Sequence, residues 1–279
     1  MSTSAHGSLL LIGGGRMGEA LASGLRRGGW ASDQLIVVET LPARRDELAR
    51  AGLAVNATVE EGWERLAGKR GNGTGAVVAV KPHDVEDVCR RLSALPGAPV
   101  DRVLSIAAGV TLRDLDAWLE PVVALRAMPN TPALVASAAS AVAPGRRAGP
   151  ADVEWAMAVL SAVGTVVELA EPGLDAVTGL SGSGPAYVFM VAEALIDAGV
   201  LAGLARPVAR ELTVQTLLGS ARLLAETGEE PSALRAAVTS PGGTTAAGLR
   251  ALEQAGVRAA VLEAVMAATE RSRELGRAH

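Results

Sequence analysis

Residues 9–18 read LLLIGGGRMG, and this stretch decides the fold prediction for the first half of the chain. Four consecutive apolar residues predict a buried strand, and the glycines after it match Gly-x-Gly-x-x-Gly at the start of a predicted helix. Gly13 would allow the tight turn, Gly15 would let a ligand approach the backbone, and Gly18 would let the helix pack on the strand. Free N–H groups at the helix start would hold a diphosphate. The stretch therefore predicts a dinucleotide site on a Rossmann-type sheet.

An acidic residue at the end of the next apolar run supports this prediction. Glu39 follows residues 35–38, about 20 residues after the last glycine of the motif, where a carboxylate that binds a ribose belongs. The same charge would repel the 2′-phosphate of NADPH, but Thr40, Arg44 and Arg45 follow, and an arginine could bind that phosphate. We therefore expect both NADPH and NADH to work, with Glu39 favouring NADH.

Short apolar runs alternate with helical patterns through the first half of the chain. The apolar runs lie at 9–12, 35–38, 76–80, 102–107, 122–125 and 165–169, and the helical patterns at 16–27, 43–51, 84–95 and 112–119. This alternation predicts an α/β doubly wound parallel sheet with helices on both faces. After about residue 170 the strand patterns end, and prolines and glycines separate about four or five predicted helices. We predict a Rossmann-like domain over 1–168 and an all-α domain over 169–279.

Composition excludes several classes of protein. The 279 residues are 49% hydrophobic and 20% charged, which is typical of a folded chain. A formal net charge of −4 is too small and too mixed to attract nucleic acid or a membrane surface. Cys89 is the single cysteine, so an intrachain disulfide is impossible, and the first residues do not resemble a signal peptide. We expect a cytoplasmic protein that acts on a small molecule.

One apolar segment, residues 185–205, is long enough to cross a membrane. Glu193 and Asp197 lie in its middle, and each charge is costly in lipid. We therefore interpret the segment as a helix inside the protein or at a subunit interface. Together with the helix predicted over 257–275, it is too apolar to stay exposed on a monomer, which predicts at least a dimer.

Familiar catalytic sets do not occur in the sequence. His83 is the one histidine away from the chain ends, and GLSGSG at 179–184 does not fit the nucleophile elbow, so a Ser-His-Asp triad is poorly supported. Cys and His show no metal-ligand spacing, so we expect no metal. The turn-rich segments 67–75 and 144–150 are predicted surface loops without the Gly-Lys-Ser/Thr of a phosphate loop.

A second glycine-rich stretch, VTSPGGTTAAG at 238–248, precedes a predicted helix. Hydroxyls and free N–H groups meet there without a bulky side chain, which suits a carboxylate. Taken alone, however, the stretch favours a simple threonine N-cap over a carboxylate site.

Six blocks, taken together, resemble the pyrroline-5-carboxylate reductases, which catalyse the last step of proline synthesis. The blocks are LLIGGGRMGEAL (10–21), AVKP (79–82), SIAAGVT (105–111), RAMPNTPALV (126–135), GLSGSGPAYVFMVAEALIDAGV (179–200) and VTSPGGTTAAGLRALEQAGVRAAV (238–261). The last block is far more specific than the glycine motif, and the six follow one another over essentially the whole chain.

This resemblance implies that 1-pyrroline-5-carboxylate is reduced to L-proline by hydride transfer from NADPH or NADH. It implies that the domain 169–279 forms a homodimer, sometimes assembled further, and binds the substrate carboxylate on residues 240–245, partly across the dimer. It places the nicotinamide near 79–82 and 128–132. The motif spacing and the resemblance together give these expected cofactor-binding residues: Gly13, Gly14, Gly15, Arg16, Met17, Gly18, Glu39, Thr40, Asn56, Ala79, Val80, Lys81, Pro82, Ala107, Met128, Pro129 and Asn130. The implied substrate-binding residues are Gly242, Gly243, Thr244 and Thr245, with Thr245 and Ser240 as catalytic candidates.

Two other functions remain open from the sequence. The same carboxylate cradle would accept another cyclic imino acid, and a nicotinamide-sensing protein would share the glycine motif. A sensor has no need of a carboxylate site, which argues against it. A protonated imine is already electrophilic, so its reduction needs mainly positioning and electrostatics rather than a strong acid–base pair. An acid at Glu39 departs from the common family pattern and puts the usual NADPH preference in doubt.

Overall fold

A computed structural model describes residues 7–67, 74–95 and 100–277 of the chain. Its contacts divide the chain into two compact units, Met1–Ser183 with Ala267–His279, and Gly184–Met266. The predicted domains 1–168 and 169–279 stay a prediction, because compactness alone does not define a domain that folds independently. Most of the segment 67–75 lies outside the described residues.

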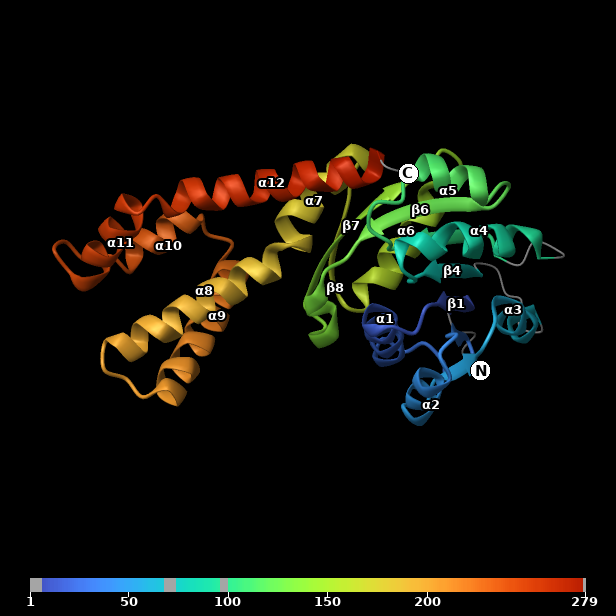
Figure 1. The fold of residues 1–279 in the computed structure, drawn as a ribbon, viewed down its shortest axis with the longest axis horizontal. Helices are drawn as coiled ribbons and strands as arrows, with labels where there is room; N and C mark the ends of the chain where they lie inside the picture. The colour runs from blue at the N-terminus through green and yellow to red at the C-terminus, as the bar shows by residue number, and fades with distance from the viewer. Residues whose placement is uncertain (1–6, 68–73, 96–99, 278–279) are drawn as a thin grey trace. The chain divides into compact units, whose positions relative to one another are not determined.

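One sheet forms the centre of the first unit (Figure 1). Its strands are β1 (Leu9–Ile12), β2 (Leu35–Val38), β3 (Ala54–Asn56), β4 (Gly75–Val78), β5 (Arg102–Ser105), β6 (Val123–Met128), β7 (Ala138–Pro144) and β8 (Gly164–Glu168). In the order β3-β2-β1-β4-β5-β6-β7-β8, the described neighbours are parallel except for the antiparallel pair β6 and β7. The strand order reverses direction between β1 and β4, which is the switch point of a doubly wound sheet. The predicted α/β fold class is confirmed.

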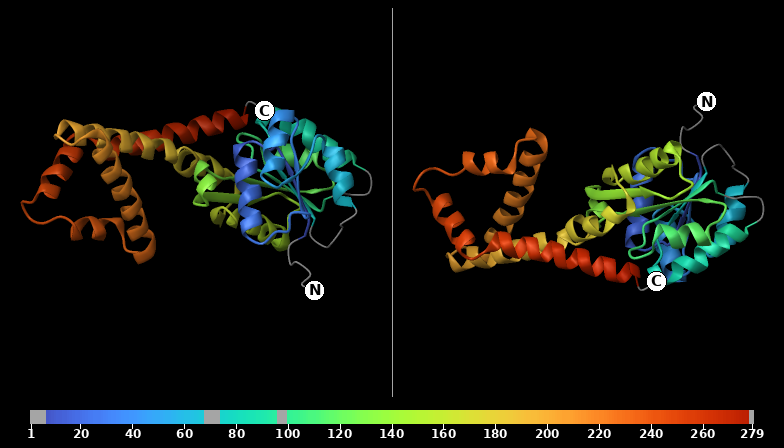
Figure 2. Two further views of the ribbon diagram at one scale, coloured as in Figure 1. Left: turned by 90° about the horizontal axis from the view of Figure 1, so that it is seen from below. Right: turned by 90° about the horizontal axis from the view of Figure 1, so that it is seen from above.

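Helices cover both faces of this sheet, as the two views of Figure 2 show. They are α1 (Arg16–Arg27), α2 (Pro42–Arg50), α3 (Val59–Ala67), α4 (Val85–Ala94), α5 (Leu112–Trp118) and α6 (Pro150–Ser161), with the short α7 (Leu174–Val177). Helices α1, α2 and α6 contribute to one hydrophobic cluster, and α3, α4 and α5 to the other. Short 3₁₀ segments lie at η1 (Pro82–Asp84), η2 (Thr131–Val135) and η3 (Glu171–Gly173), and a π-helix lies at η4 (Thr178–Gly182).

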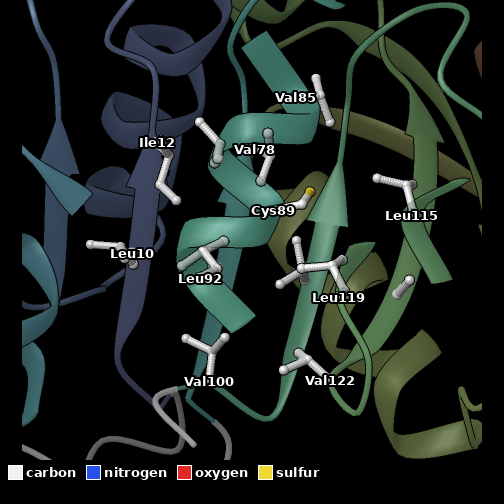
Figure 3. Packing of buried hydrophobic residues seen from close by; sticks show 14 of the residues in the cluster. Leu10, Ile12, Val78, Val85, Cys89, Leu92, Val100, Leu115, Leu119 and Val122 are labelled. Atoms are coloured by element: carbon white, nitrogen blue, oxygen red, sulfur yellow. The ribbon is translucent and has the colours of Figure 1, made fainter. Parts of the chain in front are cut away.

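Continuous apolar runs form the central strands because both faces of the sheet are buried. In β1, Leu9 and Leu11 pack in one cluster while Leu10 and Ile12 pack in the other, and all four are at most 2% exposed. Figure 3 shows Leu10 near Leu92 of α4, and Ile12 further along β1 in the same cluster. Burying each such side chain contributes about 1.5–3 kcal/mol. This burial holds β1, and with it the glycine turn, in the middle of the sheet.

Some elements were not predicted from the sequence. Strand β3 is only Ala54–Asn56, and β7 is the alanine-rich AASAVAP, so neither has the bulky β-branched pattern by which strands are recognised. Helices α3 and α6 were also missed. The strand predicted at 76–80 ends at Val78, since the next residues leave the sheet to form a loop.

The described residues of the second unit form helices joined by turns, without a strand. It contains α8 (Gly184–Leu201), α9 (Arg206–Thr227), α10 (Pro231–Ala237), α11 (Thr244–Gln254) and the first part of α12 (Val257–Arg277). Pro207 and Pro231 lie in the first turns of α9 and α10, and Gly228 ends α9 in the left-handed conformation, as the sequence predicts. The single helix predicted over 185–205 instead ends at Leu201.

Candidate active site

The predicted cofactor residues lie where strands β1 to β6 end. Because parallel strands place their carboxyl ends at the same edge of the sheet, the loops after them lie side by side. We call this edge, with the loops that follow these strands, the cofactor edge. Its predicted members are Gly13–Gly18 after β1, Glu39 and Thr40 after β2, Asn56 in β3, Ala79–Pro82 after β4, Ala107 after β5 and Met128–Asn130 at the end of β6.

In the glycine loop, two positions need glycine because of close contacts within the chain, and a third leaves open space. Gly13 has φ +107°, and a Cβ there would lie 2.6 Å from the carbonyl oxygen of Ala79. A Cβ on Gly18 would collide with the carbonyl oxygen of Gly13, so only glycine lets α1 pack this closely. Gly15 has no heavy atom within 4 Å of where its Cβ would be, and it is the N-cap of α1 without a side-chain cap. The start of α1 therefore presents uncapped N–H groups beside open space, which suits an anion.

The carboxylate of Glu39 is held by backbone amides of its own chain. Its Oε2 accepts a hydrogen bond from the N–H of Gly14 at 3.0 Å, and its Oε1 accepts one from the N–H of Leu41 at 2.8 Å. The residue is 9% exposed. Glu39 therefore braces the glycine loop, and each carboxylate oxygen keeps one further lone pair for another donor.

The two arginines after Glu39 have different surroundings. Arg44 donates to Glu19, to Glu47 and to the carbonyl oxygen of Gly14, at 2.6, 2.7 and 2.8 Å. Its hydrogen bonds with Glu47 and Glu19 raise the pKa of Arg44 above the usual arginine value. Arg45 instead donates from Nη1 to the carbonyl oxygens of Glu39 and Thr40. Arg45 is therefore the arginine of this pair whose charge no carboxylate neutralises in the described hydrogen bonds.

Asn56 contributes a buried side-chain atom. Its Oδ1 is inaccessible to solvent and has no hydrogen-bond partner among the residues that the structure describes. Its carbonyl oxygen accepts from the N–H of Glu39 at 3.0 Å, which fixes the end of β3 beside the end of β2. A buried acceptor without a partner is costly, so a donor is expected to fill this place.

The residues around the predicted nicotinamide position differ from one another in burial. Ala107 and Pro129 are buried, whereas Lys81 is exposed just before η1. Asn130 is 8% exposed, and its side chain is hydrogen-bonded to the backbone of Ser181 and Ala139. The exposed Lys81 agrees with a loop residue rather than a buried Schiff-base lysine.

The predicted carboxylate cradle lies in the second unit, at the start of α11. Gly243 is the N-cap of α11, so the alternative of a threonine N-cap is wrong, and Thr244 and Thr245 are the first helical residues. Gly242 has φ +70°, and a Cβ on Gly243 would collide with Oγ of Ser240. The turn thus requires glycine at position 242, whereas the close contact at Gly243 is with a hydroxyl that can rotate away. Because α11 lacks a side-chain cap, its first N–H groups remain available, with the exposed hydroxyls of Thr244 and Thr245 beside them.

Sequence reasoning assigned no role to an ion pair that supports the cofactor edge. Arg126 in β6 is 8% exposed and donates to Oε1 of Glu171 at 2.8 Å. The same Oε1 accepts from the N–H of Leu112, the first residue of α5, at 2.6 Å. The position of Arg126 within the RAMPNTPALV block was the available signal. Among the described residues, no group of three or more His, Cys, Asp or Glu side chains could hold a metal ion.

Comparisons with known proteins agree with this geometry. The family described as pyrroline-5-carboxylate reductase dimerisation matches residues 171–275, and the family described as NADP oxidoreductase, coenzyme F420-dependent, matches residues 8–109. The pyrroline-5-carboxylate reductase of Synechocystis sp. is 44% identical over 96% of this chain and 97% of its own length, and that of Mycobacterium tuberculosis is 43% identical over 96% of each. This chain belongs to the pyrroline-5-carboxylate reductase family.

Solved structures support the same assignment for this family member. The pyrroline-5-carboxylate reductase from Coxiella burnetii has a TM-score of 0.88 and 33% identity, covering 96% of this chain and 98% of that one. A pyrroline carboxylate reductase from Plasmodium falciparum with NADP bound has a TM-score of 0.81 and 28% identity, over 96% of this chain and 98% of that one. The open space at Gly15, the uncapped start of α1 and the buried Oδ1 of Asn56 fit a dinucleotide at the cofactor edge.

Proposed function

We propose that this protein reduces 1-pyrroline-5-carboxylate to L-proline with NADPH as hydride donor, the final step of proline biosynthesis. The 44% identity to a pyrroline-5-carboxylate reductase over nearly the whole chain carries this proposal. The net reaction adds one hydride to the imine carbon and one proton to the ring nitrogen. NADPH or NADH supplies the hydride when bound.

The residues of the cofactor edge bind and orient the dinucleotide in this proposal. The start of α1 at Gly15 binds the diphosphate through N–H groups, and Asn56 and Glu39 meet the ribose of the adenosine half. Arg45 and the hydroxyl of Thr40 take the 2′-phosphate of NADPH. The loops 79–82 and 128–130, with Ala107, form the walls around the nicotinamide, which exclude water from the transferred hydride.

The start of α11 binds the substrate. The N–H groups after Gly243 hold the substrate carboxylate, and the hydroxyl of Thr244 adds a donor. Thr245 donates a hydrogen bond at the ring nitrogen or relays its proton, and Ser240 supports the turn and is a second candidate for that relay. Because the imine is reduced more readily when protonated, this positioning replaces a strong acid–base pair.

The protein is proposed to work as a homodimer, and further assembly is compatible with it. Within Gly184–Met266 only Ala209 and Thr213 are buried among the described residues, while large apolar side chains are exposed. They include Val188, Phe189, Met190, Leu212, Leu262 and Met266, each at least 50% exposed. Apolar surface of this extent is not left in water, and a second copy of the dimerisation domain would cover it.

By length and composition alone, one described stretch, Glu171–Leu201, could cross a membrane. Glu193 and Asp197 lie within it, and Asp197 pairs with Arg206 at 2.8 Å in the helical unit. Charges of this kind favour a protein partner over lipid. We propose a cytoplasmic location. Sedimentation of the purified chain without detergent should give a dimer or a larger assembly, and a stable, active monomer would contradict the dimer.

Proline formation tests the proposed function. The purified protein is incubated with NADPH and 1-pyrroline-5-carboxylate, and proline is measured together with the loss of NADPH absorbance. Parallel reactions contain 1-pyrroline-2-carboxylate and a piperideine carboxylate, and one reaction lacks imine. We expect turnover of the 5-carboxylate to be fastest. Faster turnover of another imine would change the substrate assignment, and cofactor binding without turnover of any imine would leave a sensor instead.

A further inference from the structure

Asn130 uses both ends of its side-chain amide within the chain. Nδ2 donates to the carbonyl oxygen of Ser181 at 2.9 Å, and Oδ1 accepts from the N–H of Ala139 at 2.9 Å. A carbonyl can only accept and an N–H can only donate, so these two partners fix which end of the amide is which. With 8% of the residue exposed, one Nδ2 hydrogen and one Oδ1 lone pair are all that remain for another molecule.

These two hydrogen bonds join segments that are far apart in the sequence. Asn130 is the second residue after β6, Ala139 lies in β7, and Ser181 lies in the π-helix η4 (Thr178–Gly182). The π-helix has the hydrogen bond between residues five apart that defines this type of helix, from the N–H of Ser183 to the carbonyl oxygen of Thr178 at 2.8 Å. One-turn π-helices are rare and often occur at functional sites.

The π-helix also contacts the end of β6. A Cβ on Gly182 would lie 2.8 Å from Cε of Met128, so the π-helix packs closely against the Met128 side chain. Two hydroxyls of the π-helix donate to backbone carbonyl oxygens of α7. Thr178 Oγ1 donates to Leu174 at 2.8 Å, and Ser181 Oγ donates to Val177 at 3.2 Å. The unusual turn is therefore held by local bonds on one side and by Asn130 on the other.

We propose that Asn130 is a positioning residue: through the Ser181 carbonyl it locks the π-helix against the Met128–Asn130 wall and so fixes the place of the nicotinamide for hydride transfer. This inference rests on the proposed function. It replaces the expectation that the Asn130 side chain binds the cofactor directly. An error of about 1 Å at the reacting atoms costs on the order of 100-fold in rate, so the lock acts on kcat rather than on cofactor affinity.

The Asn130→Asp variant tests the lock because its charge can be switched by pH. At pH 8 one oxygen of the introduced carboxylate still accepts from the N–H of Ala139. The other oxygen stands where Nδ2 was, and because it is also an acceptor it repels the carbonyl oxygen of Ser181. Neither of these backbone partners titrates. When protonated, the introduced carboxyl has the shape and the donor of the parent amide, and burial beside a carbonyl raises the pKa of such a group.

We expect kcat of the Asn130→Asp variant at pH 8 to fall roughly 10- to 100-fold, with the NADPH Kd within about threefold of the parent. The variant-to-parent kcat ratio should rise toward one as the pH is lowered. Asn130→Ala should lower kcat at every pH with a flat ratio. Ser137→Ala, which removes one exposed hydroxyl bond in the same loop, should behave as the parent.

Amide hydrogen exchange gives a measurement that is independent of turnover. In Asn130→Asp, residues 178–183 should exchange faster than in the parent at pH 8, and the difference should shrink as the pH falls. A pH-independent kcat ratio with unchanged exchange would overturn the lock. A loss of NADPH affinity as large as the loss of kcat/KM would show direct cofactor binding instead. A parent that binds NADPH but reduces no imine would refute the proposed function, while the exchange experiment would still decide the lock.

Discussion

Replacing Glu39 with serine separates the two tasks that the structure assigns to this carboxylate. It braces the glycine loop by accepting from the N–H groups of Gly14 and Leu41, and its charge lies where the ribose of the cofactor is proposed to bind. Loss of the brace affects NADPH and NADH equally, because both need the same loop. Loss of the charge affects them differently, because only NADPH carries a 2′-phosphate. The ratio of kcat/KM for NADPH over NADH therefore isolates the charge.

The size of the charge effect depends on the burial of Glu39. Two unit charges about 6 Å apart repel by about 0.7 kcal/mol at a dielectric constant of 80 and by about 3 kcal/mol at 20. Glu39 is only 9% exposed, which favours the lower dielectric constant, while the guanidinium of Arg45 beside it offsets part of the repulsion. We expect a net effect of about 1–3 kcal/mol, which is a rise of roughly 5- to 150-fold in the ratio. Each charge-assisted hydrogen bond of the brace adds a further loss of about 1.5–3 kcal/mol that is common to both cofactors.

The assay is initial-rate kinetics with saturating imine and each cofactor varied in turn. Arg45→Ala is the matched control and should lower the ratio, since it removes the cation proposed for the 2′-phosphate. Arg44→Ala should weaken both cofactors alike, because this side chain is committed to Glu19, Glu47 and the Gly14 carbonyl. A Glu39→Ser ratio within twofold of the parent would refute the reasoning, and would mean that the carboxylate acts on the loop alone.

Three further changes have expected outcomes. Thr245→Ala should slow imine reduction by about 10- to 1000-fold while NADPH still binds, as expected for the loss of one positioned donor; parental turnover would remove Thr245 from the mechanism. Cys89 is fully buried, and burial raises its pKa to about 12, so a thiol reagent should label it only when the protein is unfolded; rapid labelling of the native protein would be inconsistent with this core. Hydrogen bonds from Arg91 lower the pKa of Glu60, so the pair stabilises the fold above the ordinary glutamate pKa, and this contribution is lost as the pH falls through the lowered value. Urea unfolding should therefore show Glu60→Gln to be less stable than the parent at pH 7, by at most about 1 kcal/mol for so exposed a pair. The difference should shrink as the pH is lowered below the ordinary glutamate pKa, and a difference that does not depend on pH would point to lost packing.

Structural features that depend on residues close together in the sequence were predicted well. The turn at Gly13 and the packing at Gly18 both follow from local backbone geometry, which a glycine pattern records directly. The central strands were predicted because their apolar runs are buried on both faces. Strand β3 and the alanine-rich β7 were missed because their order comes from neighbouring strands rather than from their own side chains.

The side-chain partners at the site could not be predicted in the same way. Glu39 and Asn130 were both placed in the cofactor site, yet nothing near them in the sequence indicates that Gly14 and Ser181 would be their partners. Arg126 and Glu171 are also far apart in the chain. Such pairs exist only once strands and loops have been brought to the same edge, so a local pattern carries no record of them.

The sequence by itself determined the doubly wound sheet, the dinucleotide loop, the helical second half and the family, because each depends on local periodicity or on residue types at fixed spacing. The tertiary structure alone decided how the site side chains are used. It showed that Glu39 is engaged with the glycine loop, that Arg44 is neutralised while Arg45 is not, and that Asn130 spans from β6 to the π-helix. The physical reason is that a hydrogen bond needs donor and acceptor within about 3 Å, a condition set by packing in space and not by order along the chain.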